Sequence, residues 1–594
     1  MDKKTIISKT ILFLLIVVGI ATFQQVFGSE NTLVGVTIIT AGLMFMERDL
    51  TSTPIKFLIF FSVINVMQGV FAYYTAFYPI LGVLLTFISM FLTGYLFTYN
   101  MRKPMYVAFG LQYLFMVYSP VTSEQLPMRL LALLFGAVFI MALQLLVNRN
   151  RLEKASKGIV PGITNLLENK IRTIINGDYN GEYDRDIINS IIKLNSCVQE
   201  NRQDYFHITV EGKVNFNLSI AMERINILVD RIAANHGDTP EYKEFLNSIA
   251  DILKDLTVDR NNIEGINNKI EEIERFLEKY KVIFEYENDN IGISHENIRE
   301  VLENMDFLMT TLQDIIKFNN KNYKKYVKKQ NIPKHFNVNS VLKGEFNRKS
   351  IKFSYAFKSA LLISLSIGIV EYFNIPEGRW IVFSILAITQ PYKQDSSAKS
   401  RTRIKGTIAG IIGFCVLFMI IKDPTIRSLL LMLSGYLCSF QSRYDRQMAF
   451  ITFSALGAAS LTAAAGEGGE LIFYRVLYVA IGTGIALLGN KIILPYGIED
   501  STSYLMDTYN RIITEIKKEI DLASKGEGHI DIVRNLVMQV NLIEGRVHSN
   551  LGIEDSGDPT SKEEIKDTLF KNRILINDLY DEYLGAYKKP KYTA

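Results

Sequence analysis

The residues with the clearest potential chemistry lie around one short apolar segment and the basic stretch that follows it. Trp380 stands near the start of the segment, which stops at Thr389-Gln390-Pro391. Five basic residues come next: Lys393, Lys399, Arg401, Arg403 and Lys405. A carboxylate needs cationic or N–H donors, and an aromatic ring needs an apolar wall. This stretch contains both kinds of group, so it predicts a binding site for an organic anion.

Arg403 and Lys405 are the strongest candidates for contacting the anion. We expect a helix to begin at Gly406-Thr407. The free N–H groups and positive dipole end of such a helix favour an anion, and Gly406 lets a backbone or ligand approach closely. Alternatively, the basic residues are topology signals that contact lipid head groups. We prefer that alternative for Lys393, Lys399 and Arg401. For Arg403 and Lys405 both interpretations stay open.

Further candidates flank this stretch. Thr389 and Gln390 are hydrogen-bonding ligands in one interpretation and helix-capping residues in the other. Arg129 and Arg475 each stand near the start of a long apolar run. If buried, they would form a second cationic pair, whereas an arginine at a helix end more often extends to the membrane interface. Trp380 could equally be an interfacial anchor.

Twelve apolar runs would position these residues. The first six are Ile11 to Phe27, Leu33 to Met46, Phe57 to Ala72, Ile80 to Phe97, Met105 to Tyr118 and Leu130 to Val147. The second six are Phe357 to Phe373, Trp380 to Ile388, Thr407 to Ile421, Leu429 to Phe440, Met448 to Ala465 and Leu471 to Leu494. Runs of this kind are typical of membrane helices. They predict an all-α integral membrane protein with two repeated six-helix transmembrane blocks and cytoplasmic helical domains.

The chain of 594 residues divides accordingly. We expect a first transmembrane block at 1–148, a cytoplasmic helical domain at 149–350, a second transmembrane block at 351–497 and a C-terminal cytoplasmic helical segment at 498–594. Basic residues between the runs concentrate on the side that carries the N-terminus. By the positive-inside rule, both termini are then cytoplasmic and the protein is a multi-pass protein of the cell (plasma or inner) membrane.

The two blocks resemble each other at matching positions. Lys9 and Gly19 recur with the same spacing as Lys358 and Gly368. Another set recurs near the end of each block: Glu124, Arg129 and Gly136 correspond to Glu470, Arg475 and Gly482. Six helices per copy make this a parallel repeat, and the second helix of each block is short. Short or broken helices in matching positions indicate a transporter's binding site, although a tilted helix followed by an ordinary loop is the alternative.

The soluble segments show an amphipathic helical pattern. Ile266, Ile270, Ile273 and Leu277 form an apolar stripe at helical spacing, which is typical of a bundle core. We expect two chains to form a homodimer through such cytoplasmic helices, unless the bundle buries the stripe within one chain.

Several classes of function lack the residues they need. The sequence contains no GxxxxGK[ST] phosphate loop, and its three cysteines have no metal or redox spacing. A net charge of +4 is too small to indicate nucleic-acid binding. No nucleophile, metal set or acid pair suggests an enzyme. We therefore expect neither catalysis nor a metal or cofactor, and an organic anion and the lipid membrane as partners.

One pattern resembles a known family. It comprises Trp380, Thr389 and Pro391, a serine at 396 or 397, and Arg403-x-x-Gly406-Thr407-x-x-Gly410. These residues resemble the core motif of the fusaric acid resistance (FUSC) family of bacterial aromatic-acid exporters, with a distant likeness to plant aluminium-activated malate transporters. The resemblance implies export of organic, aromatic carboxylate anions from the cytoplasm. The alternative is a non-transporting membrane scaffold or sensor whose cytoplasmic helices bind a protein partner.

Overall fold

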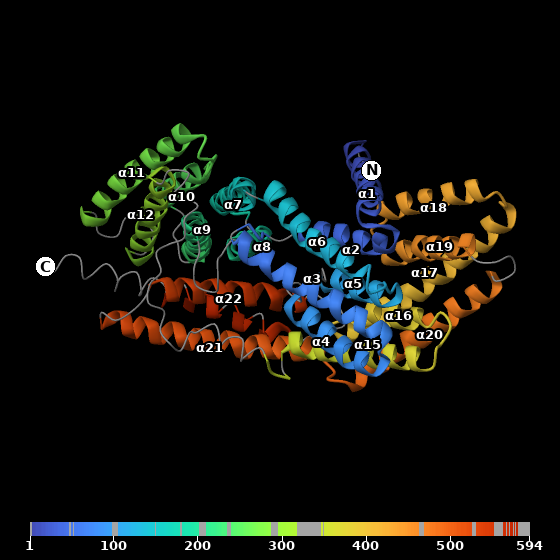
Figure 1. The fold of residues 1–594 in the computed structure, drawn as a ribbon. Helices are drawn as coiled ribbons and strands as arrows, with labels where there is room; N and C mark the ends of the chain where they lie inside the picture. The colour runs from blue at the N-terminus through green and yellow to red at the C-terminus, as the bar shows by residue number, and fades with distance from the viewer. Residues whose placement is uncertain are drawn as a thin grey trace. The chain divides into compact units, whose positions relative to one another are not determined.

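The computed structural model places most of the chain in helices (Figure 1). It describes residues 3–46, 49–51, 53–97, 105–148, 150–178, 181–200, 209–234, 239–286, 295–317, 346–348, 350–462, 468–525, 530–551, 562–565, 567–569, 571–573, 575–576 and 578–579. Contacts divide the chain into two compact units. Unit 1 comprises Met1–Glu47, Pro54–Leu146 and Asn339–Ser501, and unit 2 comprises Arg48–Thr53, Val147–Val338 and Thr502–Ala594.

The first part of unit 1 contains the six helices in which the first six apolar runs lie. They are α1 (Lys3–Phe27), α2 (Thr32–Phe45), α3 (Pro54–Phe77), α4 (Pro79–Phe97), α5 (Tyr106–Tyr118) and α6 (Leu126–Val147), with a 3-10 turn, η1 (Ser29–Asn31), after α1. Proline opens α3 and α4, where its missing N–H costs no hydrogen bond. Gly28, with φ of 90°, separates α1 from η1 in a conformation that favours glycine.

The second part of unit 1 contains α15 (Ile351–Tyr372), α16 (Arg379–Ile388), α17 (Lys393–Ile420), α18 (Pro424–Ser439), α19 (Tyr444–Thr462) and α20 (Gly468–Ile492). Each of the second six apolar runs falls mainly within one of these helices. The predicted end of one run, at 463–465, lies outside the described residues. Asp423 caps α18 by accepting hydrogen bonds from the N–H groups of Thr425 at 2.8 Å and Ile426 at 3.1 Å.

Seven helices of the described chain are long and apolar enough to cross a membrane: α1, α3, α4, α6, α15, α17 and α20. Three apolar helices are shorter, and these include α2 and α16, which were predicted to be short. The protein is therefore an all-α, multi-pass membrane protein, as predicted. The repeat of two six-helix blocks stays a prediction at this point.

The start of α17 differs from the prediction. The helix begins at Lys393, so the basic stretch is helical and Gly406 lies in the interior of α17. Residues 393–405 contain neither Gly nor Pro, and five of these thirteen residues are Lys or Arg, which favour helix. Asp395 in the first turn adds a favourable charge. The predicted helix start at Gly406-Thr407 is therefore wrong.

Close backbone contacts fix the helix pairs of unit 1. α16 packs on α20 and α17 packs on α19. A Cβ atom at Gly482 would lie 2.5 Å from the carbonyl oxygen of Ile381 in α16. A Cβ atom at Gly406 would clash with the carbonyl oxygen of Asp445 in α19. A Cβ atom at Gly410 would clash with the carbonyl oxygen of Ala449 in the same helix. Only glycine allows these helices to approach so closely.

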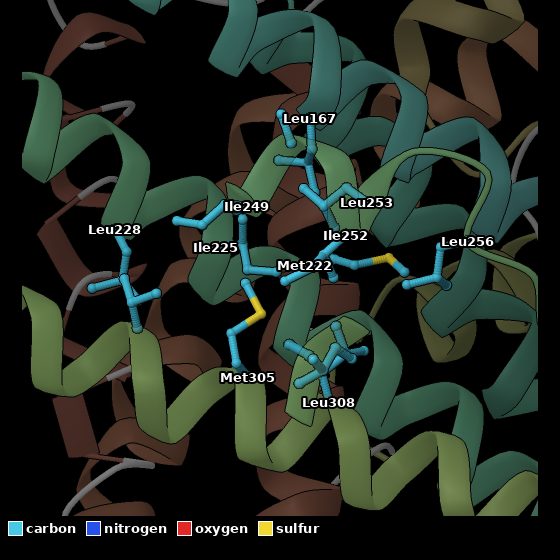
Figure 2. Close-up of a cluster of buried hydrophobic side chains, with 14 of the residues drawn as sticks. Leu167, Met222, Ile225, Leu228, Ile249, Ile252, Leu253, Leu256, Met305 and Leu308 are labelled. Atoms are coloured by element: carbon cyan, nitrogen blue, oxygen red, sulfur yellow. The ribbon is translucent and has the colours of Figure 1, made fainter. Parts of the chain in front are cut away.

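Unit 2 contains a helical bundle with its own apolar core. Its helices are α7 (Arg151–Asn176), α8 (Asp184–Glu200), α9 (Val210–Ala234), α10 (Pro240–Leu253), α11 (Ile263–Tyr286) and α12 (His295–Lys317). Figure 2 shows Met222 and Ile225 of α9 in one cluster with Leu253 of α10 and Met305 of α12. The predicted stripe from Ile266 to Leu277 is buried in the same core. The stripe is therefore part of a bundle core within one chain, one of the two predicted possibilities.

A second core joins α21 (Ile498–Ser524) and α22 (Ile530–Leu551) to α8 and α9. Tyr509, Ile516 and Val540 are buried there against Phe216 of α9. The C-terminal helices α21 and α22 thus pack on α8 and α9 of the bundle.

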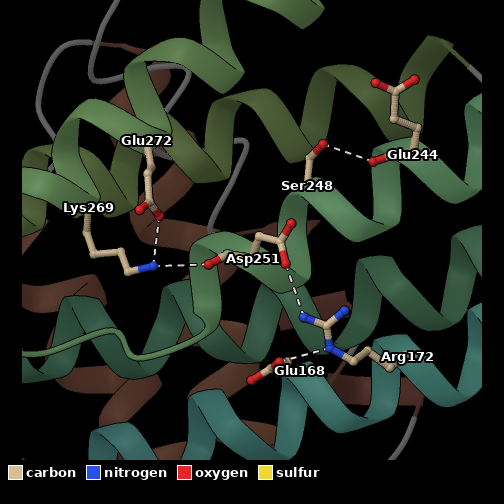
Figure 3. A network of polar contacts seen from close by, with 7 residues as sticks. All are labelled: Glu168, Arg172, Glu244, Ser248, Asp251, Lys269 and Glu272. Carbon is tan, nitrogen blue, oxygen red and sulfur yellow. Dashed lines mark hydrogen bonds and ion pairs between the residues drawn. The ribbon is translucent and has the colours of Figure 1, made fainter.

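Surface ion pairs connect the bundle helices (Figure 3). Arg172 of α7 donates to Glu168 at 2.9 Å and to Asp251 of α10 at 3.1 Å. Lys269 of α11 donates to the carbonyl oxygen of Asp251 at 3.0 Å. Each exposed pair contributes about 0.2–1 kcal/mol, so the buried cores dominate stability.

Candidate anion-binding site

Arg475 and Trp380 form the centre of the candidate site. The guanidinium carbon of Arg475, on α20, lies 3.4 Å from the centroid of the Trp380 ring on α16. The arginine is 4% exposed, so its guanidinium is enclosed by the protein. Its Nε and Nη1 atoms have no hydrogen-bond partner among the described residues. A buried guanidinium in a membrane helix with N–H groups available is the arrangement expected of an anion receptor.

Glu377 holds Trp380 in position at the start of α16. The indole Nε1 of Trp380 donates to Glu377 Oε2 at 2.8 Å, and Arg379 donates to Glu377 Oε1 at 2.6 Å. Glu377 itself has a positive φ of 55° in the turn between α15 and α16. The carboxylate is thus bonded to Arg379 and Trp380, and Arg475 forms no salt bridge with it or with any other described residue.

Arg403 adds a second buried cation to this region. It lies on α17, is 7% exposed and comes close enough to Arg475 for the two charges to repel each other. Its Nη1 donates to the hydroxyl of Tyr444 at 3.2 Å and to Met448 Sδ at 3.4 Å, while Nε has no partner among the described residues. Arg475 thus lies in the field of two other guanidinium groups, those of Arg403 and Arg379, and of one carboxylate, that of Glu377. The local charge favours an anion.

Lys405, Gly406 and Thr407 do not form the predicted cradle with Arg403. Lys405 is exposed whereas Arg403 is buried, because residues two apart on a helix point in different directions. The N–H of Gly406 lies inside α17, and its missing side chain serves the contact with α19. Thr407 is buried beside it. The predicted N-terminal N–H site is wrong, and Arg403 is the member of this group that lies near Arg475.

Thr389 and Gln390 lie at the other end of α16. Both are buried, and Thr389 Oγ1 has no hydrogen-bond partner in the described structure. The Gln390 side chain donates to the carbonyl oxygens of Ala387 at 3.2 Å and of Thr389 at 2.8 Å, which is capping chemistry. Its N–H donates to Ser396 Oγ at 3.0 Å, and Asn490 of α20 donates to the same oxygen. These residues form a polar group separate from Trp380.

Arg129 is buried like Arg475 but is fully engaged. Its Nε donates to Asn31 Oδ1 at 2.9 Å, Nη1 to the carbonyl oxygen of Ser119 at 2.7 Å and Nη2 to that of Glu30 at 2.8 Å. Arg129 therefore ties α6 to the turn before α2 and to the end of α5. The structure does not bring it together with Arg475 as a pair at one site.

Lys358 was not among the predicted site residues. It is 0% exposed on α15, and its Nζ has no hydrogen-bond partner among the described residues. The available signal was its place within an apolar helix, about two turns past the helix start at Ile351. In the sequence, Lys358 stands out only as the counterpart of Lys9 in the repeat.

Metal chemistry has no candidate in this region. No cluster of three or more His, Cys, Asp or Glu side chains suited to a metal occurs in the described ranges. The three cysteines are free thiols.

Residues 365–489 match the family described as fusaric acid resistance protein-like. The predicted resemblance to the FUSC family is confirmed. The matched segment runs from the middle of α15 almost to the end of α20 and includes Trp380, Arg403 and Arg475. Arg129 and Lys358 lie outside it. The likeness to plant malate transporters stays a prediction.

Curated relatives match over short regions. The chain is 30% identical over 159 residues to the inner membrane protein YccS of Escherichia coli, which is 26% of this chain and 21% of YccS. It is 27% identical over 122 residues to an uncharacterized Haemophilus influenzae protein, covering 20% of this chain and 17% of that protein. An uncharacterized Neisseria gonorrhoeae protein, ORF2, is 28% identical over 130 residues, covering 21% of this chain and 30% of that protein. The matches thus span less than a third of each relative, and no solved structure matches.

Proposed function

We propose that this protein is a membrane transporter that exports organic, aromatic carboxylate anions from the cytoplasm. The observation that carries the proposal is the buried Arg475 guanidinium, which lies over the face of Trp380 and has two nitrogens without a partner among the described residues. The FUSC-like segment, which contains both residues, supports it.

The chemistry of the pair suits an aromatic carboxylate. The planar guanidinium can donate two parallel hydrogen bonds to a carboxylate, and Arg403 adds positive charge nearby. Trp380 offers a flat apolar surface to the ring of the substrate. Arg475 is buried and Trp380 is half-buried, so we propose that the helices around them separate to admit and release the anion.

The internal repeat is part of this proposal, and two correspondences support it. α15, the first helix of the second block, packs on α4, and α1, the first helix of the first block, packs on α18. These are matching pairs across the blocks. In addition, Gly136 contacts Ile38 of α2, and Gly482 contacts Ile381 of α16, so each last helix meets the second helix of its own block. A pseudo-twofold pathway between the blocks is consistent with these contacts.

The membrane potential suffices to drive the proposed export. Moving one negative charge out of a negative interior gains roughly 2.3 kcal/mol per 100 mV. This holds for the proposed orientation, in which both termini and the helical domains at 149–350 and 498–594 are cytoplasmic in the cell membrane.

The proposed homodimer requires a surface other than the Ile266 to Leu277 stripe. That stripe is buried within the chain, so it is not available to a second copy. Light scattering in detergent tests whether a dimer exists.

Transport of benzoate by the purified protein in liposomes tests the proposed function. We expect efflux of radiolabelled benzoate, and little efflux of benzamide, which has the ring but not the charge. Arg475→Met should reduce benzoate flux at least tenfold, because a charge-assisted hydrogen bond contributes roughly 1.5–3 kcal/mol.

Lys491→Met is the matched control, because Lys491 is an exposed cation on the same helix, α20. It should transport like the wild type. If the wild-type protein moved no benzoate at any imposed potential, the scaffold or sensor function would replace the transporter.

A further inference from the structure

We propose that Lys358 forms a second anion-binding site, at the opposite end of the α16–α20 pair from Arg475. This inference rests on the proposed transport of carboxylates, and it adds a second position that the substrate occupies on its way. The site would comprise Lys358 of α15, Thr389 at the end of α16, Ser396 of α17 and Asn490 of α20.

The environment of Lys358 is unusual for a lysine. The side chain is completely buried in a membrane helix, and its Nζ has neither a hydrogen bond nor a salt bridge within the described ranges. A buried ammonium without a counter-charge is strongly unfavourable, and such residues in membrane segments mark functional positions. An anionic ligand that visits the amine would supply the missing counter-charge.

Contacts on either side of Lys358 locate it beside the last turns of α20. Ser354, four residues before it, donates to the carbonyl oxygen of Leu494 at 2.8 Å. Leu362, four residues after it, lies 2.6 Å from the Cβ position of Gly489. Residues four apart share one face of a helix. The face of α15 that carries Lys358 therefore meets the C-terminal turns of α20, where Asn490 stands.

The polar groups at this end have hydrogen-bonding capacity left over. Ser396 Oγ accepts from the N–H of Gln390 and from the Asn490 side chain, so its own proton can be donated to a ligand. Thr389 Oγ1 has no partner among the described residues. Two hydroxyl donors and an ammonium are suitable partners for the oxygens of a carboxylate.

The two sites are well separated along the membrane path. Fifteen residues separate Arg475 from Asn490 on α20, which at 1.5 Å per residue is about 22 Å. This is most of a hydrocarbon core of about 30 Å. A transported anion that binds at two positions needs only moderate affinity at each, which permits both entry and release.

Equilibrium dialysis of the detergent-purified full chain with radiolabelled benzoate tests the second site. Trp380 is the sole tryptophan of the sequence, so its fluorescence reports the first site in the same samples. We expect the wild type to bind two benzoates per chain. Lys358→Met should bind one, with the benzoate concentration at half-maximal Trp380 response changed less than twofold.

Two variants control for folding and charge. Lys358→Gln should behave like Lys358→Met. It provides an independent measurement of the number of bound benzoates if one of the two variants misfolds. Lys352→Met removes another cation from α15 and should still bind two. Two benzoates per chain in both Lys358 variants would overturn the second site and leave the proposed function intact. If the wild type binds benzoate only at the Trp380 site, the second site is likewise overturned and the proposed function stands. If the wild type shows no saturable binding of benzoate, both proposals are overturned.

Discussion

At the scale of residues, Arg129 and Arg475 differ in how their guanidinium groups are satisfied. Arg129 donates three hydrogen bonds to its own block, whereas Nε and Nη1 of Arg475 have no partner in the described structure. The sequence alone could not separate them, because both stand in matching contexts near the start of an apolar run. Hydrogen-bond geometry decides which arginine is structural and which is available to an anion.

Replacing each arginine by methionine should therefore affect stability to different extents. Arg129→Met leaves the side-chain oxygen of Asn31 and two carbonyl groups without their donor, and each buried acceptor left unsatisfied should lower the free energy of unfolding by roughly 1–3 kcal/mol. Arg475→Met removes a buried charge that has no salt bridge, so we expect no loss of stability without ligand. Thermal unfolding in detergent, followed by circular dichroism, measures the difference. Equal destabilisation by both variants would mean that Arg475 is a structural residue.

At the scale of elements, the glycines of α17 serve packing against α19. We expect Gly406→Ala to cost roughly 1–3 kcal/mol, because its Cβ would clash with the backbone of Asp445. Gly413→Ala on the same helix is the control, since its Cβ would lie 3.9 Å from Phe453, an ordinary contact distance. Thermal unfolding of the two variants compares them. If Gly413→Ala is as unstable as Gly406→Ala, the loss of stability comes from the reduced backbone flexibility of α17 and not from a clash with α19.

A second element-scale feature is a buried charge cluster in unit 2. Arg573, from the C-terminal segment, pairs with Glu223 of α9 at 2.5 Å and lies 3.7 Å from Glu544 of α22. Burial alone would lower the pKa of Arg573, but the two carboxylates raise it above its ordinary value. The arginine thus stays charged and joins the three segments.

Arg573→Met should destabilise this part of unit 2 by roughly 3–5 kcal/mol, because it leaves two buried carboxylates without their cation. Faster hydrogen exchange of α22 amides in the full chain is the expected readout. Adding Glu223→Gln to this variant should restore part of the protection. No change in α22 exchange after Arg573→Met would show that the segment is not held by this cluster.

At the scale of the whole molecule, apolar runs located the seven long apolar helices of the described chain, because lipid-facing segments must be apolar along their length. They could not locate the start of α17, because a basic helix and a basic loop have similar compositions. They also missed Lys358, since the sequence shows a flanking lysine and only packing shows that the amine is enclosed. Of the predicted site residues, Trp380, Arg403 and Arg475 come together, while Arg129, Lys405 and the Thr389-Gln390 pair lie elsewhere.

We also expect transport by the whole molecule to be electrogenic. In liposomes loaded with benzoate, an interior-negative potential should accelerate efflux and an interior-positive one should slow it, because one uncompensated negative charge moves. Potassium gradients with valinomycin set the potential. Efflux rates independent of its sign would indicate coupling to a compensating ion.

The most direct test of the central claim is a benzoate titration of Trp380 fluorescence in the purified protein. The claim is that Arg475, over the ring of Trp380, binds the carboxylate of the transported anion. We predict a saturable change in the wild type, the same change in Lys491→Met, and at least tenfold weaker binding in Arg475→Met. A wild type without a saturable response, or an Arg475→Met variant with unchanged affinity, would contradict the account.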